Sequence, residues 1–121
     1  KNFKLVMGLP GDKAKNRRSE LASLFDKFSK VYLTMDHPGY EEVEDICNEV
    51  ISYVNCDTPY EIITDRTCAI DTCMKEATKD DVILILGKGS EDYQLIKGQK
   101  IPYEGDIKVV NKIMEDTYGK N

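Results

Sequence analysis

The chain has 121 residues, 40% of them hydrophobic and 32% charged, which is enough to bury a hydrophobic core, and nothing suggests a second domain. Its net charge of −5 and its lack of any block of lysines or arginines argue against nucleic acid or an anionic membrane as the main partner. No apolar stretch has the length of a membrane span or of a secretory signal, so we expect a soluble, cytoplasmic protein.

Short apolar runs alternate with helical periodicity along the chain. Strands are predicted at residues 3–8, 30–36, 60–65 and 81–87. Helices are predicted at residues 19–30, 40–55, 66–78 and 106–118. Strands that alternate with helices indicate a mostly parallel sheet with helices on both faces, so the expected fold class is α/β and Rossmann-like.

Three details of this pattern carry further expectations. The run at 81–87 is almost wholly apolar, which is typical of a strand covered on both faces. The segments 93–96 and 100–104 are joined by only three residues, which favours an antiparallel hairpin near the edge of the sheet. The last helix is expected to turn four apolar residues inward, namely Ile107, Val110, Ile113 and Met114.

The four cysteines form no Cys-x-x-Cys pair and have no histidine nearby. We therefore expect reduced cysteines and no metal site, with Cys47 packed as a small hydrophobic residue on a helix. Because the chain starts at Lys1 inside a strand-like run, we also expect it to be a piece of a longer protein.

In an open parallel sheet, ligands bind beyond the carboxyl ends of the strands, and the unusual residues of this chain lie in the loops expected there. Charges of both signs converge on this rim, which suits a zwitterion such as an amino acid. The charged rim residues are Asp12, Lys13, Lys15, Arg17, Arg18, Asp36, His37, Arg66, Lys88, Glu91 and Asp92.

Each loop also has a simpler interpretation. The glycines serve tight turns equally well, and Asp36-His37-Pro38-Gly39 has an ordinary turn composition. His37 is either a binding residue or a solvated surface histidine. Lys15, Arg17 and Arg18 would either hold a phosphate at a helix amino terminus or be solvated loop charges.

Nucleotide and nucleophile motifs are absent from the sequence. The P-loop pattern does not occur, and "GLPGDK" has the wrong spacing for a dinucleotide fingerprint. No Gly-x-Ser-x-Gly elbow occurs either. We therefore expect no catalytic residue in this chain and no activity from it in isolation.

The stretch "VILILGKGSEDYQLIKGQKIPY" resembles the carboxy-terminal domain of the Mur ligases, above all the tripeptide synthetases, in which an apolar strand runs into Gly-Lys-Gly-His-Glu-Asp-Tyr-Gln. Ser90 replaces the histidine, and the other seven motif residues are present, as Gly87, Lys88, Gly89, Glu91, Asp92, Tyr93 and Gln94. The segments "GLPGDKAKNRR", "DHPG" and "EIITDRTCAI" are similar to further family motifs in the same order, so the likeness covers essentially the whole chain.

The resemblance implies an ATP-dependent ligase of peptidoglycan precursor synthesis, with ATP and Mg²⁺ bound mainly by domains absent from this chain. Such an enzyme adds the third residue to UDP-N-acetylmuramoyl-L-alanyl-D-glutamate through an acyl phosphate. Residues 1–121 would form its carboxy-terminal, amino-acid-delivering domain, in contact with a central ATPase domain. The partners implied are an amino acid and a UDP-muramyl peptide.

The resemblance also assigns substrate-binding positions. Glu91 would hold the distal amine of the incoming diamino acid, and Gly87 would contribute backbone beside it. Lys13 stands where an arginine meets a substrate carboxylate, which keeps the charge but loses the bidentate fork. Lys88 would be a charged residue of the rim. Arg17 and Arg18 would be rim charges as well if they do not hold a phosphate.

The "DHPG" segment departs from the family's Asp-Asn-Pro-Arg in two places. Asp36 and Pro38 match, whereas His37 replaces asparagine and Gly39 replaces arginine. In enzymes that select meso-diaminopimelate this arginine pairs with the distal carboxylate, which a glycine cannot do. L-lysine is therefore the expected substrate, with ornithine second. A divergent paralogue with another substrate and a non-catalytic interaction module remain as alternatives.

Overall fold

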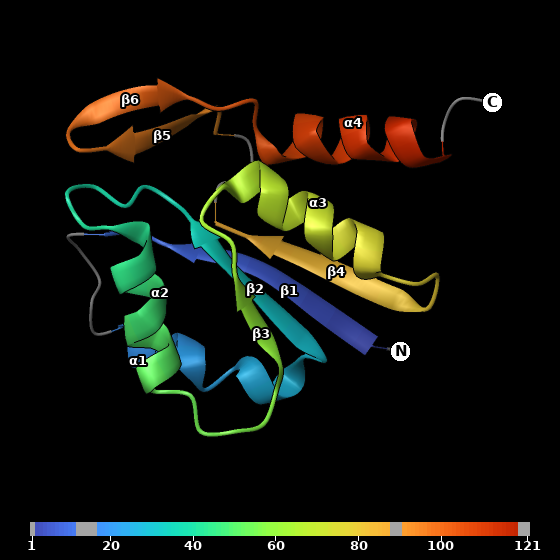
Figure 1. Cartoon of the computed structure of the whole chain (residues 1–121), viewed down its shortest axis with the longest axis horizontal. Helices are drawn as coiled ribbons and strands as arrows, with labels where there is room; N and C mark the ends of the chain where they lie inside the picture. The colour runs from blue at the N-terminus through green and yellow to red at the C-terminus, as the bar shows by residue number, and fades with distance from the viewer. Residues whose placement is uncertain (1, 12–16, 88–90, 119–121) are drawn as a thin grey trace.

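The computed structural model describes residues 2–11, 17–87 and 91–118. A four-stranded parallel sheet in the order β3-β2-β1-β4 forms its centre (Figure 1). The strands of the sheet are β1 (Asn2–Leu9), β2 (Lys30–Met35), β3 (Tyr60–Ile62) and β4 (Asp81–Leu86). The helices are α1 (Arg17–Ala22), the short 3-10 turn η1 (Phe25–Lys27), α2 (Val43–Ser52), α3 (Arg66–Glu76) and α4 (Asp106–Tyr118). The α/β prediction is confirmed.

The two faces of the sheet bury separate cores because successive side chains of a strand point to opposite faces. On one face, Leu5 and Met7 of β1 pack with residues of α1, η1 and α2. On the other face, Val6 of β1 and Tyr32 of β2 pack with α3 and α4. Helices therefore cover both faces, as predicted. None of the helices in the described residues is long and apolar enough to cross a membrane.

Two buried cysteines serve these cores, one on each face. Cys47 of α2 lies in the first core and Cys73 of α3 in the second. Burial raises the pKa of the Cys47 thiol to about 12 and that of Cys73 to about 11. Both thiols therefore stay protonated at neutral pH and pack as small apolar groups.

The predicted helix at 19–30 is wrong in its length. The chain instead forms α1 and, after a break, η1, which places Phe25 in the first core. The apolar residues of segment 19–30 recur at helical spacing, but the segment packs on the sheet as two short pieces, α1 and η1, instead of one helix. Arg18, expected on the rim, is fully buried in α1.

Arg18 is held by two acids from distant parts of the chain. Its guanidinium donates to Glu41 at 2.9 Å and to Glu49 of α2 at 2.6 Å. Burial disfavours the charge of Arg18, but these hydrogen bonds and charges hold its pKa above the ordinary value. Arg18 thus joins α1 to α2, and the expectation of a rim charge is wrong for this residue.

The expectation that both faces of the run at 81–87 are covered is also wrong. β4 is the edge strand of the four-stranded sheet, and Leu84 and Leu86 are 41% and 44% exposed. In α4 the inward face is rotated from the predicted one. Ile113 is buried as predicted and Val110 is partly buried, but Ile107 and Met114 are 64% and 46% exposed. Val109 is buried in their place, because α4 packs beside α3.

The predicted hairpin is present as β5 (Tyr93–Ile96) and β6 (Gln99–Pro102), which pair antiparallel. It forms a sheet of its own and lies over the carboxyl ends of the parallel strands (Figure 1). The Gly39 N–H donates to the Leu95 carbonyl at 3.0 Å, and the Lys97 N–H donates to the Gly39 carbonyl at 2.7 Å. The loop after β2 thereby anchors the hairpin.

One buried arginine joins the strand ends to the last helix. Arg66 donates to the carbonyls of Met35, at the end of β2, and Leu86, at the end of β4, both at 3.0 Å. It also makes two hydrogen bonds of 2.8 Å to the carboxylate of Asp106 at the start of α4. Burial opposes the Arg66 charge, but Asp106 outweighs it and holds the pKa of the guanidinium above its ordinary value.

Removing the carboxylate of Asp106 should strongly destabilise the fold. Asp106→Ala leaves Arg66 charged and buried without its main counter-ion, which costs about 3 kcal/mol. Urea unfolding of the chain measures the loss. The control is Asp116→Ala on the same helix, where the side chain is exposed and a change within about 0.5 kcal/mol is expected. Equal effects of the two variants would contradict the role given to the buried pair.

Candidate functional site

The site begins where β2 and β4 end, directly beyond the two carbonyls that Arg66 holds. Asp36 follows Met35 and is buried, with 8% of its surface exposed. Gly87 follows Leu86 and has φ +124°, and a Cβ there would lie 2.9 Å from Oδ2 of Asp36. Only glycine allows the end of β4 to approach the Asp36 carboxylate so closely.

The loop after β2 is pinned on both sides. His37 has φ 51° and Gly39 has φ 65°, so the chain turns sharply within these residues. The Gly11 N–H donates to the His37 carbonyl at 2.9 Å, and the His37 N–H donates to Oε1 of Gln94 at 3.2 Å. The loop therefore links the end of β1 to the hairpin.

The His37 ring makes two hydrogen bonds that define which ring nitrogen carries the proton. Nδ1 accepts from the Leu95 N–H at 3.0 Å, so Nδ1 carries a lone pair. Nε2 lies 2.8 Å from Oε1 of Glu91. These contacts assign the neutral tautomer with its hydrogen on Nε2, where it donates to the carboxylate.

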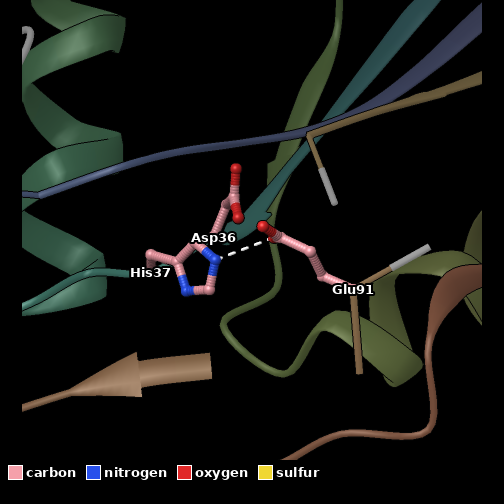
Figure 2. A group of neighbouring side chains, drawn as sticks. All are labelled: Asp36, His37 and Glu91. Carbon is pink, nitrogen blue, oxygen red and sulfur yellow. Dashed lines mark hydrogen bonds and ion pairs between the residues drawn. The ribbon is translucent and has the colours of Figure 1, made fainter. Parts of the chain in front are cut away.

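Asp36, His37 and Glu91 form one cluster, with one ligand atom of each within 4.8 Å of the others. Figure 2 shows the Glu91 side chain reaching toward the His37 ring, with the Asp36 carboxylate beside them. Two carboxylates lie close together beside a neutral histidine, and the charge of Arg66, which donates to Asp106 and two carbonyls, also interacts with Asp36. The cluster is suited to a cation that donates hydrogen bonds, such as an ammonium group.

A metal ion fits this cluster poorly. A metal-bound histidine normally donates its second ring N–H to an acceptor, which fixes the tautomer. Here Nδ1 of His37 instead accepts a hydrogen bond from Leu95, so a metal on Nε2 would leave the ring with no proton at all. The hydrogen-bond pattern therefore disfavours a metal ion bound through Nε2 of His37.

Most of the predicted site residues that the structure describes do come together. Asp36, His37, Gly87 and Glu91 surround one point, and Pro38 is buried next to them. Gly39 lies on the hairpin side of the loop, where it forms an isolated bridge with Ile96.

Two further predicted residues, Arg17 and Arg18, do not join the cluster. Arg17 is exposed at the start of α1, and Arg18 is buried between α1 and α2 as described above. Lys13 and Lys88 lie outside the described residues.

Sequence reasoning missed the residues that support the site. Arg66 was expected as a rim charge but is 2% exposed, and Asp106 was not singled out. Tyr103 was also missed; its hydroxyl donates to Asp106, and burial together with this bond raises the pKa of the phenol. The available signal was an arginine at the start of a helix, where a positive charge is unfavourable unless an acid lies nearby.

Comparison with known proteins gives a consistent picture. Residues 1–89 match the family model described as Mur ligase, glutamate ligase domain. A solved structure titled UDP-N-acetylmuramoyl-L-alanyl-D-glutamate--2,6-diaminopimelate ligase superposes with a TM-score of 0.88 at 26% identity, over 98% of this chain and 25% of that one.

Curated relatives are similar over most of the chain. The UDP-N-acetylmuramyl-tripeptide synthetase of Lactobacillus delbrueckii subsp. bulgaricus is 40% identical over 93% of this chain. The UDP-N-acetylmuramoyl-L-alanyl-D-glutamate--L-lysine ligase of Streptococcus pyogenes serotype M4 is 37% identical over 87% of this chain. The chain spans 22% of the length of each of these two relatives. By its family match, its fold and its relatives, the chain belongs to the Mur ligase family.

Proposed function

We propose that residues 1–121 are the amino-acid-delivering, carboxy-terminal domain of a cytoplasmic, three-domain ligase. The enzyme would add L-lysine as the third residue of UDP-N-acetylmuramoyl-L-alanyl-D-glutamate in peptidoglycan synthesis. The observation that carries the proposal is the cluster of Asp36, His37 and Glu91 beyond the strand ends. The names of the relatives support the same reaction.

The proposed role of this chain is to bind and orient the amino acid. Asp36 and Glu91 would accept hydrogen bonds from the side-chain ammonium group of lysine, which leaves the α-amine directed toward the neighbouring domain. The nitrogen of that amine would bond to the carbonyl carbon of the acyl phosphate on D-glutamate. The bond from that carbon to the phosphate oxygen would break, and the nitrogen would lose a proton as the amide forms. Holding the amine in place turns an encounter in solution into a reaction within one complex.

ATP would supply the phosphoryl group that activates the glutamate carboxylate. This chain has no P-loop, and the hydrogen bond at Nδ1 disfavours a metal on Nε2 of His37, so both ATP and Mg²⁺ are assigned to the other domains. The UDP-muramyl peptide and the central ATPase domain are the further partners in this proposal.

Lysine is favoured over meso-diaminopimelate by the charge and shape of the loop after β2. Gly39 offers no side chain to a distal carboxylate, and its backbone is engaged by Leu95 and Lys97 of the hairpin. A second carboxylate on the substrate would also lie near Asp36 and Glu91, where like charges repel. The similarity to a lysine ligase supports this choice.

The full-length enzyme should select its amino acid accordingly. With UDP-N-acetylmuramoyl-L-alanyl-D-glutamate and ATP, phosphate release should be fastest with L-lysine, slower with L-ornithine, and lower by about 100-fold in kcat/KM with meso-diaminopimelate. Substantial turnover of meso-diaminopimelate would overturn the lysine assignment. Silence with all three would favour a divergent paralogue or a non-catalytic module.

Replacing Glu91 should weaken lysine binding. Glu91→Gln keeps the size of the side chain but removes its charge, and a hydrogen bond to a charged group is worth about 1.5–3 kcal/mol. KM for lysine should therefore rise by about 10- to 100-fold. KM for the UDP-muramyl dipeptide should not change. The control is Glu115→Gln on the exposed face of α4, which should leave both constants alone. A normal KM for lysine in the Glu91 variant would refute this contact.

A further inference from the structure

We infer that His37 is a positioning residue with two separable tasks. Through Nε2 it holds the carboxylate of Glu91 beside Asp36, and through Nδ1 it docks the β5–β6 hairpin on the end of the sheet. The first task sets the affinity for the amino acid and therefore rests on the proposed function. The second task concerns the fold alone.

The ring is held in one orientation by three neighbours. The Leu95 N–H fixes Nδ1, the Glu91 carboxylate fixes Nε2, and the Tyr93 ring lies 5.2 Å away between centroids at an interplanar angle of 39°. All three belong to the segment that follows β4. The ring therefore connects the end of β2 to this segment at three points.

The backbone of His37 is equally constrained. Its φ of 51° lies in the left-handed region, which costs energy in residues other than glycine. The bonds from Gly11 to its carbonyl and from its N–H to Gln94 stabilise this conformation. This backbone conformation directs the His37 side chain toward Glu91. Relaxing the left-handed backbone would therefore move the ring.

The neutral tautomer matters for the charge of the site. A lysine or arginine in this place would also donate to Glu91, but it would cancel the negative charge that an incoming ammonium group needs. The His37 Nε2–H orients the carboxylate without adding a positive charge. A neutral donor thus fixes the geometry of the acid and preserves its attraction for a cation.

Asparagine and glutamine can separate the two tasks. The side-chain oxygen of asparagine lies at the level of Nδ1 and can accept from the Leu95 N–H, but its amide does not extend to Glu91. The amide nitrogen of glutamine lies at the level of Nε2 and can donate to Glu91, but it provides no acceptor at the Nδ1 position. His37→Leu removes both groups.

In the full-length enzyme, His37→Asn should raise KM for lysine by about 10-fold with kcat and the KM for the UDP-muramyl dipeptide unchanged. His37→Gln should recover most of the lysine affinity that His37→Leu loses. Urea unfolding should rank the variants differently. His37→Asn should have a midpoint near that of the original protein, whereas His37→Gln and His37→Leu should have lower midpoints. Parallel losses of affinity and stability in all three variants would show that His37 acts on the fold alone.

The tautomer can be read directly, because His37 is the only histidine in the chain. Nitrogen-15 NMR of the chain, prepared without a histidine tag, should show a protonated Nε2 and an unprotonated Nδ1 at neutral pH. A proton on Nδ1 would overturn the inference. This readout does not depend on ligase activity, so an enzyme that fails to use lysine would refute the proposed function and leave the docking role of His37 to be judged by NMR and unfolding.

Discussion

The hydrogen bonds of Arg66 are the constraint on which the rest of the structure depends. One guanidinium group holds the last carbonyls of β2 and β4 and the carboxylate at the start of α4. The residues directly beyond those carbonyls are Asp36 and Gly87. The Arg66 guanidinium therefore also fixes the separation of the two loops that form the site. Because the pair with Asp106 is buried, its geometry is insulated from solvent and salt.

This arrangement divides the charged residues into two classes. Arg18 and Arg66 are buried with acids that neutralise them, and they join elements of the fold. Glu91 is partly exposed, and the His37 ring that donates to it is neutral, so this hydrogen bond does not cancel the negative charge of Glu91. Among the described residues, the two buried arginines thus join elements of the fold, while Asp36 and Glu91 lie at the strand ends, where their charges can attract an amine.

The sequence predicts the positions of the helices and strands better than it predicts which of their side chains are buried. Helix 106–118 was predicted with its true bounds and with Ile113 inward, but Val109 is buried in place of Ile107 and Met114, because α4 packs against α3, which the periodicity of one helix does not reveal. Arg18 illustrates the same limit, since its partners lie 23 and 31 residues away. The site residues were found by their resemblance to a family motif, whereas Arg66, Asp106 and Tyr103 depend on contacts that form only in the folded chain.

The loop Asp36-His37-Pro38-Gly39 shows why its composition alone left two interpretations open. It is a tight turn, as its glycine and proline indicate, and it is also the place where β1, β2 and the hairpin meet. A turn can form a binding site when residues outside the turn hold its backbone by hydrogen bonds, because only then do its side chains keep one orientation. Here Gly11, Gln94 and Leu95 fix His37, and His37 in turn orients Glu91. Any change that moves the hairpin must therefore move the Glu91 carboxylate, so the position of the hairpin and the recognition of the substrate amine are physically coupled.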